Sequence, residues 1–215
     1  MKYLKITNYI LILWLSIGLL ACNSIVGREK NSSEKSRTSD STSLNSIQST
    51  ESKTITTFEC VRGQAEPIIK KEYFPNTTFT LQADSITAIE TVQFDNGDKL
   101  TIKNWGCEYY VLTFNFETTQ FQKDTTDLKF WYQSTIQLMT SILAGLDAPI
   151  DIKKGLTFLE SYYLKDKKNN FKNLKLEEEI DFADNEIRSF VTLDRIKQIN
   201  KKTFEVSVSF AVGPL

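Results

Sequence analysis

Apolar and polar residues alternate along several stretches of the chain, and a period of two indicates β-strands. The clearest stretch is Phe204–Val212, where the even positions are large and apolar and the odd positions are small or polar. Further strands are predicted at Phe79–Gln82, Ala88–Phe94, Lys99–Lys103, Tyr109–Glu117, Leu174–Phe182 and Ile187–Ile199. The sequence Asp95-Asn96-Gly97-Asp98 predicts a hairpin, because Asn-Gly tolerates the positive φ of a type I′ turn.

Between the two sets of predicted strands, apolar residues recur every three to four positions, which is the spacing of a helix. One helix is predicted around Leu128–Leu146, with Asp124 or Thr125 as its cap and Gly145 marking its end. A second helix is predicted from Ile152 to Leu164, capped by Asp151, with a solvated loop over residues 165–170. The expected fold is therefore α+β: an antiparallel sheet with two consecutive helices inserted between an N-terminal and a C-terminal set of strands.

Two cysteines, Cys60 and Cys107, fall within this predicted domain. In an exported protein they are expected to pair as a structural disulfide. The bond would close a loop of roughly 48 residues and contribute about 4 kcal/mol in the chain-entropy model. The alternative is two free buried thiols.

The amino-acid composition excludes several classes of catalytic and ligand-binding site. The chain contains no histidine, which excludes Ser-His-Asp and Cys-His nucleophile pairs, histidine-ligated zinc and haem histidines. No basic stripe with interleaved aromatic residues is present, so a nucleic-acid partner is not expected. No metal and no cofactor are expected either.

The densest candidate binding patch surrounds Cys107. It consists of Trp105, Glu108, Tyr109 and Tyr110. Tryptophan and tyrosine supply rigid contact area with a polar tip, which is typical of recognition surfaces. The structural alternative is that Trp105 packs over the disulfide and that alternate tyrosines join the core. Adjacent strand residues point to opposite faces, so Tyr109 and Tyr110 are expected to lie on different sides.

Acidic residues offer a weaker candidate site. Glu90, Asp98 and Glu108 lie in one predicted strand region, and a glycosidase needs two carboxyl groups within about 5–10 Å. The acidic run Glu177-Glu178-Glu179 lacks the spacing of a calcium-binding loop. Solvated sheet residues are the expected role of both groups.

The first 21 residues have the composition of an export signal. Lys2 and Lys5 precede an apolar run of about 12 residues, whereas a membrane-spanning helix needs roughly 20. The run ends in Leu19-Leu20-Ala21-Cys22, which resembles the lipobox of bacterial lipoproteins. The resemblance implies cleavage before Cys22 and acyl chains on Cys22, which anchor the protein in a membrane. An ordinary secretory signal is the alternative.

The segment that follows the predicted anchor differs sharply from the rest of the chain. Residues 23–57 include ten serines and six threonines and lack aromatic residues, so they bury too little surface to offset the entropy of ordering. The expected organisation is a signal peptide over 1–21, lipidated Cys22 plus a flexible tether to residue 57, and one globular domain over 58–215. Asn23 after the cysteine favours the outer membrane, facing the periplasm.

These features predict a lipid-anchored envelope protein with a non-catalytic binding module. The expected partners are the membrane, through the acyl chains, and a protein or envelope polymer, as in inhibitor, immunity or accessory-subunit lipoproteins. The alternative is a small hydrolase that acts on envelope glycan or peptide through carboxylates alone.

Overall fold

The computed structural model describes residues 60–184 and 186–215. The predicted signal peptide, the lipobox with Cys22, and the tether to residue 57 lie outside the described residues. None of the described helices is long and apolar enough to cross a membrane.

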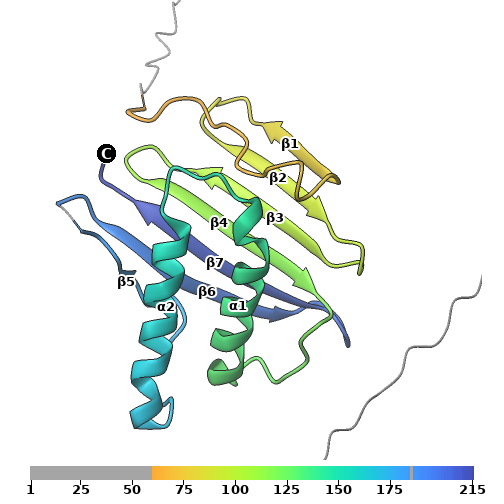
Figure 1. Ribbon diagram of the computed structural model, residues 1–215, viewed down its shortest axis with the longest axis vertical. Coiled ribbons are helices and arrows are strands. Elements are labelled where there is room, and N and C mark those ends of the chain that lie inside the picture. Colours follow the sequence, from red (N-terminus) through yellow and green to blue (C-terminus); the bar gives the residue numbers. More distant parts are fainter. Residues whose placement is uncertain (1–59, 185) are drawn as a thin grey trace, which may run out of the picture. The chain divides into compact units, whose positions relative to one another are not determined.

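A seven-stranded antiparallel sheet forms the body of the domain (Figure 1). Its strands are β1 Thr77–Leu81, β2 Ala88–Gln93, β3 Lys99–Trp105, β4 Tyr110–Thr118, β5 Ile180–Asp181, β6 Ser189–Gln198 and β7 Phe204–Val212. Their order across the sheet is β1-β2-β3-β4-β7-β6-β5. The pairing of β4 with β7 joins the N-terminal set of strands to the C-terminal set. The predicted α+β fold class is confirmed.

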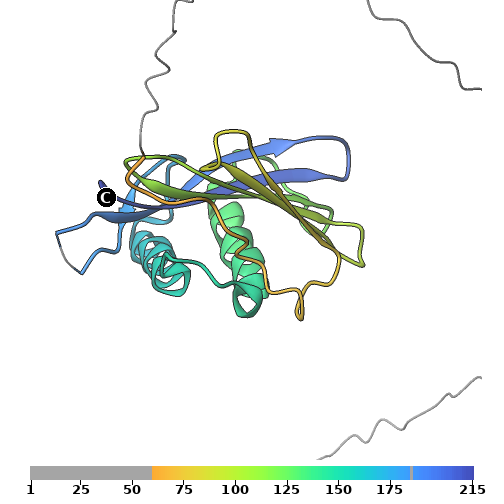
Figure 2. The same cartoon turned by 90° about the horizontal axis from the view of Figure 1, so that it is seen from above.

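Two helices lie against one face of the sheet, as Figure 2 shows. They are α1 Leu128–Ile142, followed by the short 3₁₀ turn η1 Leu143–Gly145, and α2 Ile152–Asp166, followed by η2 Lys167–Asn169. Asp151 caps α2 as predicted, accepting a hydrogen bond from the Lys154 N–H. The predicted cap of α1 is wrong: Asp127 caps this helix, and Asp124 instead accepts from Thr126 in the preceding turn.

The core lies between the two helices and the inner face of the sheet. The central strands contribute fully buried side chains such as Phe114 and Phe210, and α1 contributes Trp131 and Met139. Gly155 of α2 lies directly against β7, because a Cβ added at this position would come within 2.8 Å of the Phe210 ring. The absence of a side chain therefore allows α2 to approach the sheet closely.

The segment before β1 also covers the inner face, beside α1 (Figure 2). Ile68 and Ile69 are buried, and Ile69 forms an isolated antiparallel bridge with Leu146. Both backbone N–H groups donate to the carboxylate of Glu90, at 2.7 Å and 3.0 Å. Glu90 thereby fixes this segment to β2.

Three further local predictions are wrong. Of the predicted strand Leu174–Phe182, only β5 is a strand; Glu177, with φ of 60°, breaks the extended backbone before it. Residues 165–170 are not a simple solvated loop, because α2 continues to Asp166, whose buried carboxylate accepts hydrogen bonds from Asn169 and Asn173.

The third concerns the turn of the β2–β3 hairpin: the predicted hairpin is present, but its turn is not type I′. Among residues 94–98 only Gly97 has positive φ, at 86°, whereas a type I′ turn needs two such residues. The Gly97 N–H donates to the Phe94 carbonyl, and the Phe94 N–H donates to the Asp98 carbonyl. This is the three-residue hairpin in which a left-handed glycine follows a type I turn.

Candidate functional site

The outer face of the sheet, opposite the helices, is where the structure places Trp105 and Tyr109. Strand register sets its side chains in rows across the sheet. Trp105, Val111, Ala211 and Phe190 form one row over β3, β4, β7 and β6. Lys103, Thr113, Ser209 and Thr192 form the next. An apolar row thus borders a polar one.

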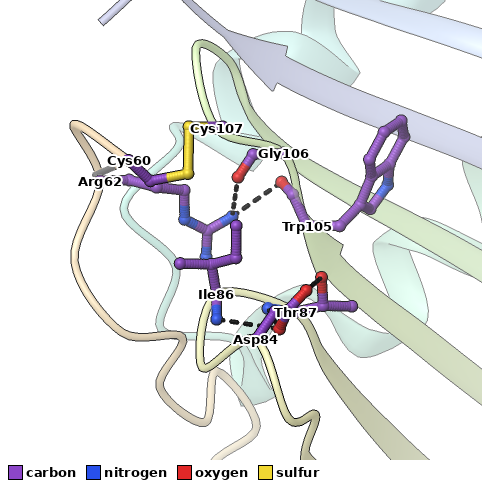
Figure 3. The surroundings of a disulfide bond; sticks show 8 residues. All are labelled: Cys60, Arg62, Asp84, Ile86, Thr87, Trp105, Gly106 and Cys107. Carbon is purple, nitrogen blue, oxygen red and sulfur yellow. Dashed lines mark hydrogen bonds between the residues drawn. A yellow bond between two sulfur atoms is a disulfide. The ribbon is translucent and has the colours of Figure 1, made fainter. Parts of the chain in front are cut away.

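Trp105 is the most exposed residue of the apolar row, at 38 %. Its indole points away from the Cys60–Cys107 disulfide (Figure 3), so it does not pack over that bond. The indole N–H donates to the Thr113 hydroxyl at 3.1 Å, and the Lys103 ammonium lies 4.7 Å from the ring centroid. The ring is held in place while it remains open to solvent.

Two further aromatic residues complete what we call the aromatic corner: Trp105, Tyr109 and Phe190. The rings of Tyr109 and Phe190 meet edge to face, with centroids 6.3 Å apart. The Arg188 guanidinium lies 4.9 Å from the centre of the Phe190 ring and also pairs with Glu179. The aromatic residues at the two ends of the row, Trp105 and Phe190, therefore each have a basic side chain over the ring.

A hydroxyl network lies beside the aromatic corner, and we define it as Thr113, Thr192, Ser207 and Ser209 around Asp194. Ser209 and Ser207 donate to one oxygen of Asp194, at 2.6 Å and 3.3 Å, and Thr192 donates to the other. Thr113 and Ser209 are 2.9 Å apart, which connects Asp194 to Trp105 through two hydroxyls. Together, the aromatic corner and the hydroxyl network form the outer-face site.

Asp194 is the only acid in this network. It occupies the register shift between Leu193 and Arg195, where β6 bulges against β7. Among the described residues no cation pairs with its carboxylate, so burial raises its pKa, although the hydrogen bonds from Ser209, Thr192 and Ser207 oppose this effect. β-Bulges often lie beside functional sites because they redirect a side chain.

The structure separates the predicted patch into two groups. Trp105 and Tyr109 lie on the outer face. Tyr110 lies on the opposite side, where its hydroxyl accepts a hydrogen bond from Asn104 and its ring contacts Arg62. Glu108 is exposed in the β3–β4 loop. The prediction that the two tyrosines face opposite sides is confirmed.

The predicted disulfide is present, linking Cys60 to Cys107 beside Arg62 (Figure 3). The Arg62 guanidinium is buried and donates to the carbonyl oxygens of Trp105 and Gly106 and to the side chain of Asn104. The disulfide and Arg62 therefore attach the start of the described chain to the end of β3. This attachment fixes the loop that follows Trp105.

The three candidate acids do not come together. Glu90 is buried on the inner face, and burial raises its pKa although hydrogen bonds from Ile68 and Ile69 oppose this. Asp98 precedes β3 and Glu108 follows it, so a strand of seven residues, roughly 20 Å long, separates them. Burial disfavours the charge of Asp98, but hydrogen bonds from Gln120, Thr118 and Thr119 outweigh it and hold its pKa below the ordinary value.

The acidic run near residue 178 also gives no ion site. Within residues 60–184 and 186–215, no group of three or more acidic or cysteine side chains is arranged to hold a metal ion. Glu179 instead pairs with Arg188.

Sequence reasoning missed Arg62 and Asp194. Asp194 interrupts the alternation of β6, and this irregularity was the one local signal of a bulge. Two of its three hydroxyl partners, Ser207 and Ser209, come from β7, 13 and 15 residues further along the chain. The link from Ser209 to Thr113 spans 96 residues, which no local pattern encodes.

No family model matches the chain, and no curated protein or solved structure shows significant similarity to it.

Proposed function

We propose that this chain is a lipid-anchored envelope lipoprotein whose globular domain is a non-catalytic binding module, with the outer-face site as its binding surface. The Leu19-Leu20-Ala21-Cys22 sequence supports the anchor. The exposed indole of Trp105, held by Thr113 on the face opposite the helices, supports the binding surface.

A binding role accounts for an exposed tryptophan better than a structural role does. Large aromatic residues at the surface are enriched at recognition sites because they offer rigid apolar area with few degrees of freedom to lose. We do not propose the carboxylate hydrolase, since Glu90 and Asp98 are occupied by hydrogen bonds and Glu108 lies apart from both.

The anchor is tested by Cys22→Ser in cells. We expect the variant to leave the membrane fraction, because the acyl chains supply the attachment. A variant that stays membrane-bound after cleavage of the signal would overturn the anchor.

The binding surface is tested by crosslinking in cells with Trp105→Ala and with Phe158→Ala as its control. Phe158 lies on α2, is 40 % exposed and also has a lysine near its ring, so the two variants remove similar aromatic surface from different faces. We expect Trp105→Ala alone to release the captured partner, with a loss of about 2 kcal/mol or more. Equal capture by both variants would contradict the assignment.

A further inference from the structure

We infer that the ligand of the outer-face site is a glycan strand rich in hydroxyl and amide hydrogen-bond donors. This inference rests on the proposed binding function and names its ligand. It follows from the direction in which the hydrogen bonds of the hydroxyl network run.

That direction is fixed by the Asp194 carboxylate. An ionised carboxylate only accepts hydrogen bonds, and a hydroxyl has one hydrogen to donate. Ser209 donates its hydrogen to Asp194 at 2.6 Å. Thr113, 2.9 Å from Ser209, must then donate to Ser209. Thr113 in turn accepts from the Trp105 indole.

The Asp194 carboxylate also accepts hydrogen bonds from the two remaining hydroxyls. Thr192 and Ser207 both donate to Asp194. All four hydroxyls of the network have therefore given up their only hydrogen within the protein. Thr192 and Ser207 are themselves buried. Thr113 and Ser209 are half-buried and each retains a free lone pair, so these two hydroxyls present acceptors to a ligand.

Hydroxyls that can only accept further hydrogen bonds favour a ligand that supplies hydrogen-bond donors. Sugar hydroxyls and N-acetyl amides supply such donors at short intervals. Phosphate groups do not, because they are acceptors themselves, which disfavours nucleic acid and phosphorylated ligands. Since an unpaired polar group costs free energy when it is desolvated, a mismatch at this surface weakens binding.

The aromatic corner suits the same ligand. The C–H face of a sugar ring packs on an indole, and Trp105 lies in the row beside the hydroxyl network, to which its indole N–H is hydrogen-bonded through Thr113. Lys103 is exposed, and an exposed cation–π contact contributes little, so the lysine can move aside. The apolar row is not a continuous exposed stripe, because Ala211 within it is only 2 % exposed, so the surface lacks the extended apolar core that is typical of homodimer interfaces.

The arrangement of the rows on the sheet indicates the path of the glycan. The residues from Trp105 to Asp194 lie on β3, β4, β7 and β6. Neighbouring strands are about 4.8 Å apart, so the contacts extend over roughly 14 Å from β3 to β6, and they cross the β-strands obliquely because Trp105 and the hydroxyls lie in successive rows. This is the length of a short oligosaccharide.

The probes are purified peptidoglycan sacculi and a soluble N-acetylglucosamine hexasaccharide, with the full acylated chain in detergent micelles. Co-sedimentation measures binding to sacculi, and calorimetry measures binding to the hexasaccharide. We expect Trp105→Ala to weaken both by about tenfold or more. Phe158→Ala should bind like the unaltered chain. Circular dichroism confirms that each variant is folded.

Asp194→Asn tests the direction of the network separately. An amide places N–H donors where the carboxylate accepted, so the hydroxyl hydrogens can turn outward and the match with the ligand is lost. We expect weaker binding at neutral pH. We also expect the unaltered chain to lose affinity as Asp194 becomes protonated, and Asp194→Asn to show no such pH dependence.

Three other outcomes overturn the inference. If neither glycan binds but crosslinking captures a protein at Trp105, the ligand class is wrong and the proposed function stands. If glycan binding survives Trp105→Ala and Asp194→Asn, the site is wrong. If neither glycan nor protein binds while the chain remains in the membrane, the proposed binding function itself fails.

Discussion

The Ser209 hydroxyl donates a hydrogen bond to the Asp194 carboxylate at 2.6 Å across the β6–β7 ladder. This hydrogen bond helps to hold the ionisable Asp194 side chain on the outer face of the sheet. Within the described residues no basic side chain pairs with Asp194. The carboxylate depends on hydroxyl donors alone, and this dependence has a consequence for stability.

Asp194 makes the domain less stable as pH rises. Burial raises its pKa in the folded state above the ordinary value of 3.8, so between the two pKa values the folded state binds more protons than the unfolded state. The free energy of unfolding therefore falls with increasing pH through this window. Asp194→Asn lacks the titrating group.

The measurement is chemical denaturation of both chains from pH 3 to pH 8. We expect the stability of the unaltered chain relative to Asp194→Asn to decrease as pH rises. Glu90 also has a raised pKa, but it is present in both chains and cancels in the difference. A difference that is constant or increases with pH would contradict this assignment.

Removal of the Cys60–Cys107 disulfide is expected to cost stability through the unfolded state. The bond joins residues 47 apart, and the chain-entropy model gives about 4 kcal/mol for a loop of this length. The double variant Cys60→Ser, Cys107→Ser should unfold at lower denaturant concentration than the oxidised chain. Reduction of the unaltered chain should produce the same shift, and an unchanged midpoint on reduction would be inconsistent with a structural bond.

Gly155→Ala is expected to destabilise the domain although alanine favours helices. The added Cβ would lie 2.8 Å from Phe210 and 2.9 Å from Phe182, both rings packed in the core. Overpacking of this kind costs about 1–3 kcal/mol. Gly63→Ala is the control, because a Cβ there meets nothing within 4 Å. Thermal unfolding compares the two; equal melting temperatures would show that α2 can move away from β7.

Glu90→Ala is expected to cost about 2–3 kcal/mol, since it leaves two buried backbone N–H groups, those of Ile68 and Ile69, without acceptors. Glu108→Ala should change stability by less than about 0.5 kcal/mol, because Glu108 is exposed. Urea denaturation distinguishes the two variants. In the Glu90 variant, hydrogen exchange should accelerate at Ile68 and Ile69; unchanged exchange there would mean that Glu90 does not hold this segment.

The sequence alone determined the elements with a strong local signal. The alternation in Phe204–Val212 predicted β7, and a single apolar stripe predicted α2 with its Asp151 cap. With only two cysteines in the domain, the disulfide pair was also predictable. Each of these depends on residue types a few positions apart or on a count.

Tertiary structure alone decided which side chains form the outer-face site. Trp105 and Tyr110 belong to the same predicted patch, yet strand pairing turns one outward and the other toward Arg62. A register shift of one residue would exchange the two faces. The contact of Thr113 with Ser209, and of Ser209 with Asp194, requires β4, β7 and β6 to be aligned, and that alignment is fixed by packing of the whole sheet against α1 and α2.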